Sequence, residues 1–150
     1  MKIYHTSPNK IEKIEKNGLF DDNLFFSRVP YSMSNSNGDE TLYLIDIEED
    51  SVIDVTQFFY DYDIEENDEF RNIVETISNY FTCAIDDACE ILDSSKNIDD
   101  AEDDWFVQAQ QGHAARALGF NAAKSIDEQG VVYIVPMFGK EKELKIVDNY

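Results

Sequence analysis

The order of sequence patterns along this 150-residue chain predicts an α+β fold. Short apolar or alternating runs, typical of strands, extend up to Val55 and return from Ala122 onward, whereas helical periodicity occupies about residues 64–118. Strands followed by helices and then by more strands favour a mixed or antiparallel sheet with a helical insertion over alternating βαβ units. No linker interrupts these patterns, so we expect one domain over residues 1–150.

The first part of the chain predicts four extended segments separated by breaks. Ser7-Pro8 ends the first segment, because proline removes a backbone donor, and the pair also suits the start of a short helical turn. A brief helix is expected over Val29–Ser36, which carries Tyr31. The expected strands are Met1–Thr6, Leu24–Ser27, Thr41–Glu48 and Val52–Val55.

The middle of the chain has the residue spacing of amphipathic helices. Acidic residues are enriched at the start of the first helix, where the helix dipole favours them. A shorter helix over Ala84–Leu92 follows, and a third runs from the acidic segment before Trp105 to Leu118, where Gly119 ends it. The apolar positions of the first helix are Phe70, Ile73, Val74, Ile77, Tyr80 and Phe81.

An acidic turn that leads directly into a buried strand is the most informative stretch of the chain. Asp127-Glu128-Gln129-Gly130 precedes the β-branched run Val131–Val135. Carboxylates at the mouth of a buried strand are held rigidly and partly desolvated, which suits a charge that acts on a ligand. Taken alone, such a turn is more often a solvated surface feature. The strands expected here are Ala122–Ser125, Val131–Met137 and Leu144–Val147.

The net charge of −20 restricts the partners of the protein. A chain this acidic is repelled by nucleic acids and anionic membranes, so direct DNA or RNA binding is not expected. The acidity is concentrated, because between Gly38 and Trp105 the only basic residues are Arg71 and Lys96. Either a basic protein partner or mimicry of a nucleic-acid backbone is consistent with this charge.

Cysteine, histidine and hydropathy patterns exclude several classes of protein. The two cysteines, Cys83 and Cys89, and the two histidines, His5 and His113, have no zinc-ligand spacing, so no metal is expected. Such sparse cysteines are typical of a reducing compartment. No apolar run is long enough to span a membrane, and no leader segment is visible. We therefore expect a cytoplasmic protein.

Three short patterns occur in order on the predicted strands. His5 lies near the end of the opening strand, Leu24–Ser27 brings an aromatic pair on the next strand, and Asp127-Glu128 precedes a strand after the helices. A histidine, an aromatic platform and a carboxylate on successive sheet elements resemble the ADP-ribosyltransferase fold, in its histidine-tyrosine-glutamate class.

The resemblance is closer to one branch of that superfamily. Ile3–Pro8, the Leu-Phe-Phe segment, Leu118-Gly119-Phe120 and Asp127-Glu128-Gln129-Gly130 are similar to the phage anti-CRISPR ADP-ribosyltransferases directed at type I-F surveillance complexes. The acidic helical middle is similar only in general character. The resemblance implies transfer of ADP-ribose from NAD to a side chain of a protein subunit of that complex in the bacterial host, which would block recognition of target DNA.

The resemblance also implies a catalytic carboxylate. Breaking the nicotinamide–ribose bond develops an oxocarbenium-like cation, which a fixed carboxylate stabilises more than it stabilises the ground state. Asp127 is the first choice for this acid, and Glu128 is the alternate or the residue that orients the acceptor. The wider class usually has glutamate here, so the aspartate gives a shorter reach.

Binding of NAD would involve the first strands, by the same resemblance. His5, helped by Thr6, would hydrogen-bond a ribose hydroxyl, and the nicotinamide ring would stack between Tyr31 and either Phe25 or Phe26. A phenylalanine in place of the tyrosine of the class keeps the stacking surface but loses a hydroxyl. In general, a lone histidine near a strand end is more often structural, and such aromatic residues usually lie in the core.

Two other functions are consistent with the sequence. A non-enzymatic inhibitor would use the carboxylates of residues 39–104 to mimic DNA, and an ADP-ribosyltransferase toxin would share the pocket but modify another host protein. A mimic has no use for an NAD pocket, so the pattern favours the enzyme. Trp105 is expected to be either a core residue or a partner contact, and the sequence does not predict an oligomeric state.

Overall fold

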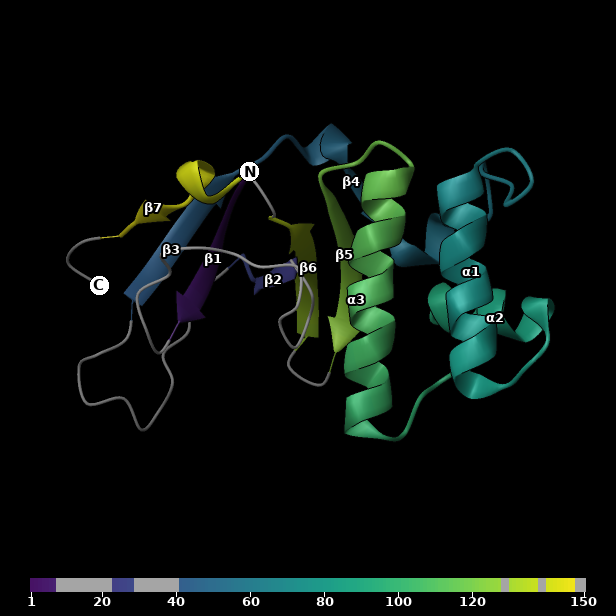
Figure 1. Cartoon of the computed structure of the whole chain (residues 1–150). Coiled ribbons are helices and arrows are strands. Elements are labelled where there is room, and N and C mark those ends of the chain that lie inside the picture. The colour runs from purple at the N-terminus through teal and green to yellow at the C-terminus, as the bar shows by residue number, and fades with distance from the viewer. Residues whose placement is uncertain (8–22, 29–40, 128–129, 138–139, 148–150) are drawn as a thin grey trace.

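Two β-sheets lie side by side in the computed structural model, and three helices lie beyond the second sheet (Figure 1). The structure describes residues 1–7, 23–28, 41–127, 130–137 and 140–147. Strands precede and follow the helices along the chain, so the predicted α+β class is confirmed.

The first sheet is antiparallel and contains the amino-terminal strand. Ile3 pairs with Ile45 across its two longer strands, and both side chains are buried. The terminal ammonium group donates to Asp46 Oδ1 at 3.0 Å and to the Ile47 carbonyl at 2.8 Å, which ties the start of the chain to the sheet. In spatial order the strands are β1 (Lys2–Ser7), β3 (Thr41–Asp46) and β7 (Lys145–Ile146).

The second sheet is mixed, because its edge strand β4 is parallel to β5 while the other pairs are antiparallel. The two sheets are joined by a backbone bridge, in which the amides of Tyr4 and Ser27 each donate to the other residue's carbonyl at 2.8 Å. In spatial order the strands are β2 (Asn23–Phe26), β6 (Gly130–Pro136), β5 (Ala122–Asp127) and β4 (Val52–Asp54).

Polar caps set where two of the helices begin. The Asn67 side chain accepts a hydrogen bond from the Phe70 amide at 3.0 Å, so the first helix starts after Asn67 and not at Ile64, where the periodicity begins. Asp100 accepts from the Asp103 amide at 3.1 Å in the same way. The helices are α1 (Asp68–Phe81), α2 (Ile85–Leu92) and α3 (Ala101–Ala117).

Helix α3 packs closely against the second sheet through a glycine. A Cβ at Gly112 would overlap Asn23 Oδ1 and would lie 2.7 Å from Asn23 Cγ and 2.9 Å from Ile134 Cγ2. Asn23 is itself buried, and its Nδ2 donates to the Ala109 carbonyl at 3.1 Å. The helix can therefore approach β2 and β6 this closely only because position 112 has no side chain.

The buried residues form two cores on opposite faces of the second sheet. One core lies between this sheet and the helices, and its larger members include Phe58, Phe70, Ile77, Leu92 and Ile134. The other core lies between the two sheets and includes Ile3, Phe26, Ile45, Tyr133 and Val135.

Each strand and helix expected from Thr41 onward is present, with ends shifted by a few residues. The helical turn after Ser7 and the brief helix over Val29–Ser36 fall outside the described residues. Within the described part of the chain, the structure has no helix that is both long enough and apolar enough to cross a membrane.

Candidate active site

His5 is held in one orientation by the neighbouring strand of the second sheet. Its Nδ1 lies 2.7 Å from the Phe25 carbonyl oxygen, and its ring is 5.5 Å from the ring of Phe26, centroid to centroid. A carbonyl oxygen can only accept, so Nδ1 carries the proton of this hydrogen bond. His5 is thus fixed near the bridge that joins the two sheets.

Burial determines the protonation state of this histidine. Desolvation lowers the pKa of His5 below its ordinary value, and the hydrogen bond to Phe25 opposes this only in part. The ring is therefore neutral at neutral pH, with a proton on Nδ1 and a lone pair on Nε2. A neutral imidazole in this tautomer can accept a hydrogen bond from a ligand hydroxyl, which is the role expected for His5 toward a ribose.

Thr6 and Phe26 lie in less accessible positions. Thr6 is 7% exposed, and because successive side chains of a strand point to opposite faces, it does not lie beside the His5 ring. Phe26 is 1% exposed and belongs to the core between the sheets, so it offers no free ring face to a ligand. Phe25 is half-buried and packs against the core on the helical side, so its ring lies on the opposite face of β2 from Phe26 and the His5 ring. Neither phenylalanine therefore presents a free ring beside His5.

Asp127 is the last residue of β5 and pairs with Gly130 at the start of β6. Gly130 has a φ of +114°, a conformation that only glycine adopts readily, so the start of β6 depends on it. Lys124, Tyr133 and Phe26 lie opposite one another on β5, β6 and β2. Asp127 is three residues further along β5, about 10 Å toward the hairpin at the usual rise of a strand.

The structure thus brings some of the predicted residues together and leaves others undescribed. His5, Phe25 and Phe26 are direct neighbours, and Asp127 lies at the end of a strand in the same sheet as the two phenylalanines. Tyr31 and Glu128 lie outside the described residues. Within the described ranges, no group of three or more potential ligand side chains could hold a metal ion.

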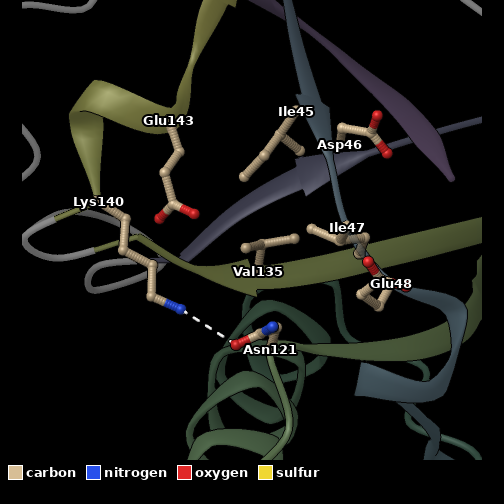
Figure 2. Close-up of a pocket in the computed structure, with 8 residues that line it drawn as sticks. All are labelled: Ile45, Asp46, Ile47, Glu48, Asn121, Val135, Lys140 and Glu143. Atoms are coloured by element: carbon tan, nitrogen blue, oxygen red, sulfur yellow. Dashed lines mark hydrogen bonds between the residues drawn. The ribbon is translucent and has the colours of Figure 1, made fainter.

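A separate cavity of about 370 Å³ contains none of the predicted residues (Figure 2). Ile45 and Val135 line it from the two sheets, and Lys140 Nζ donates to Asn121 Oδ1 at 3.4 Å beside it. The terminal ammonium group lowers the pKa of Asp46, another lining residue, through a hydrogen bond and its charge. Asp46 is therefore engaged in anchoring the chain terminus, and we do not place the reaction here.

Comparison with known proteins identifies the family. The family described as anti-CRISPR type I-F ADP-ribosyltransferase AcrIF11 matches residues 1–141. The chain belongs to this family. It is therefore an ADP-ribosyltransferase, an enzyme of the glycosyltransferase type that uses NAD, and the resemblance inferred from its short motifs is confirmed.

Structural comparison agrees with this assignment at the level of the fold. A crystal structure of an anti-CRISPR protein matches with a TM-score of 0.56 and 19% sequence identity, over 90% of this chain and 88% of that chain. A comparison with curated proteins found no match. The family supports an anti-CRISPR activity for this ADP-ribosyltransferase, whereas the roles of single residues rest on the geometry above.

Proposed function

We propose that this ADP-ribosyltransferase modifies a side chain of a protein subunit in the type I-F CRISPR surveillance complex and thereby blocks recognition of target DNA. The observation that carries the proposal is the neutral His5, which is oriented by the Phe25 carbonyl at 2.7 Å in a chain of this family. NAD supplies an ADP-ribose unit whose bond to nicotinamide breaks, with the electron pair leaving on nicotinamide.

The residues of the chain have separate tasks in this reaction. His5 Nε2 accepts a hydrogen bond from a ribose hydroxyl, and Tyr31 is the aromatic residue expected to stack on the nicotinamide ring. The Asp127 carboxylate stabilises the positive charge that develops on the ribose, with Glu128 as the alternate acid. The acceptor atom of the target then forms a bond to the ribose carbon and releases its proton.

Mass spectrometry of a purified type I-F surveillance complex tests the proposal. The complex is incubated with the protein in the presence and absence of NAD, beside the variants Asp127→Ala and Glu65→Ala. We expect one subunit to gain the mass of ADP-ribose only with NAD. Asp127→Ala lowers the rate at least about 100-fold, as expected for loss of a charge-stabilising group. Glu65→Ala, which removes an exposed carboxylate before α1, behaves as wild type.

A DNA-mimic function is favoured by a different observation, the acidic helical region. Among residues 39–104, only Arg71 and Lys96 are basic. If the protein blocks DNA binding by the complex equally well without NAD and with Asp127→Ala, the mimic replaces the enzyme as the cause of inhibition. Inhibition that requires both NAD and Asp127 contradicts the mimic.

A further inference from the structure

A second cavity lies beside the hairpin that carries Asp127 and has no part in the proposed reaction. It has a volume of about 300 Å³ and is formed by the segment after α2, by one side of α3 and by the end of β5. Its β5 wall consists of Ser125 and Ile126, the two residues that directly precede Asp127. We call it the α2–α3 cavity.

One buried acceptor in this cavity has no partner among the described residues. Gln111 lines the cavity and is 2% exposed, and its Nε2 donates to the Leu92 carbonyl at 2.9 Å and to Ser94 Oγ at 3.0 Å. The carbonyl can only accept, so the amide cannot be reversed, and Oε1 is left without a hydrogen bond. A buried unpaired acceptor costs about 1–3 kcal/mol, so a donor supplied from outside would be bound favourably.

Backbone strain occurs at the same place. Ser94 has a φ of +67°, a left-handed conformation that is unfavourable for residues other than glycine. Its hydroxyl is also the group that contacts the Gln111 amide. Ser94 directly follows the C-cap of α2, where a left-handed residue commonly ends a helix, and the end of α2 thus places this hydroxyl at the cavity.

The charges of the cavity favour a cation. Asp99 and Asp104 line it, against Lys96 as the only basic residue among its described lining. Asp99 lies in the segment after α2, and Asp104 and Gln111 lie on α3, so a ligand between them must present several donors in different directions. Guanidinium carries five N–H donors in a planar fork, whereas ammonium is a compact point charge. The cavity therefore suits an arginine side chain better than a lysine side chain.

An exposed apolar pair adjoins the cavity on the hairpin. Ile126 lines the cavity and is 78% exposed, and its cross-strand partner Val131 is 44% exposed. Large apolar side chains exposed next to a charged pocket are typical of a surface that a protein partner covers. The pair is also next to Asp127, so a protein that covers it has its surface close to the proposed acid.

We propose that the α2–α3 cavity binds an arginine side chain of the protein that is modified, while Ile126 and Val131 pack against the residues flanking that arginine. The arginine is an anchor and is distinct from the modified residue. It directs the enzyme to a basic protein surface and holds that surface beside Asp127. The identity of the partner rests on the proposed function, but affinity of the cavity for a guanidinium group does not.

Binding of agmatine to the full chain without NAD tests the cavity itself. We expect agmatine to shift the side-chain amide signals of Gln111 in NMR spectra and to bind more tightly than 1,5-diaminopentane, which carries the same charge but has no guanidinium group. Asp99→Lys places a cation at the cavity and weakens agmatine binding about 10-fold, whereas Glu65→Lys makes the same charge change at a distant exposed site and weakens it less than about 2-fold. No shift at Gln111, equal binding of 1,5-diaminopentane, or equal weakening in both variants would overturn the proposal.

A kinetic comparison separates this proposal from the proposed function. With the surveillance complex as substrate, Asp99→Lys should raise KM for the complex about 10-fold relative to Glu65→Lys, equivalent to about 1.4 kcal/mol. If the wild-type protein transfers no ADP-ribose to the complex but binds agmatine, the proposed function fails and the cavity assignment stands. If transfer occurs and the two lysine variants have the same KM, the anchor is wrong and the function stands.

Discussion

The two halves of the molecule differ sharply in charge. Residues 39–104 contain 23 carboxylates against Arg71 and Lys96, a net charge of −21, whereas the rest of the chain is close to neutral. The helices α1 and α2 and the start of α3 belong to the acidic part, and most strands of the two sheets belong to the balanced part. Negative charge is thus concentrated on the helical side, and the part of the chain that contains His5 and Asp127 has almost no net charge.

This difference indicates a division of tasks. The sheets orient a neutral histidine by burial and by a backbone carbonyl, which needs a rigid and uncharged surrounding. The helical side presents carboxylates and exposed aromatic side chains, including Tyr80 at 47% and Trp105 at 39% exposure, which suits recognition of a basic partner. Chemistry and partner selection are therefore expected to respond to different perturbations.

The largest expected effect concerns the contact between α3 and the second sheet, which lies within the balanced part of the chain. Gly112→Ala should lower the free energy of unfolding by about 1–3 kcal/mol, because the new Cβ overlaps Asn23, which is held by its hydrogen bond to Ala109. In a helix without this contact, the same substitution would stabilise the protein by about 0.5–1 kcal/mol. Urea unfolding of the wild type and of Gly112→Ala shows whether the substitution lowers or raises the free energy of unfolding. An increase would contradict the close packing of α3.

Ionic strength should separate partner binding from NAD binding. Raising the salt concentration from about 50 mM to about 500 mM shortens the Debye length severalfold and weakens attraction between the acidic helices and a basic partner. We expect KM for the surveillance complex to rise about 10-fold and KM for NAD to change less than about 2-fold. Initial-rate measurements with each substrate varied in turn test this. If KM for the surveillance complex and KM for NAD change by the same factor, partner binding and NAD binding do not depend on separate parts of the molecule.

His5 should make the sheet region sensitive to acid. Its pKa is lowered in the folded state by burial, so its contribution to stability is complete above the unfolded value of 6.5 and is lost as the pH falls through the lower folded pKa. Unfolding measured at about pH 7.5 and about pH 5.5 should show a larger loss for wild type than for His5→Gln, which does not titrate. Equal losses would indicate that His5 is not buried in its neutral form.

The smallest effect is expected for an ion-pair cluster on the acidic side. Arg71 lies 3.3 Å from Asp68 and 3.8 Å from Glu75 on the surface of α1. Exposed pairs of this kind contribute little, so Arg71→Gln should change the free energy of unfolding by about 0.5 kcal/mol or less. A loss above about 1.5 kcal/mol would show that the acidic side needs this cation for its stability.

Much of the local structure could be predicted from the sequence, because it depends on neighbours along the chain. The three-and-four spacing of Phe70, Val74 and Ile77 predicted α1, and all three side chains are fully buried. The β-branched run after Gly130 predicted β6, and short motifs at both ends of the chain predicted the family. The start of α1 could not be read from periodicity alone, since Asn67 ends the preceding turn by capping the helix.

The position of Trp105 could not be decided from the sequence either. A tryptophan on a helix is consistent with the core or with a partner contact, and only the packing of α3 leaves it 39% exposed. The expected contribution of Phe26 to ligand stacking had the same ambiguity. From the sequence, either phenylalanine of β2 could stack on a ligand. In the structure, Phe26 lies on the face of β2 that packs between the sheets and is buried in that core.

By itself, the sequence determined the class of fold, the family and the concentration of acid in the middle of the chain, because composition, periodicity and short motifs are local properties. The tertiary structure alone decided which side chains share a cavity. Gln111, in a helix of mixed polarity, shows no pattern that predicts its burial; it is buried because α3 lies against a sheet and the segment after α2 closes over it. Contacts between residues far apart in the chain depend on this packing.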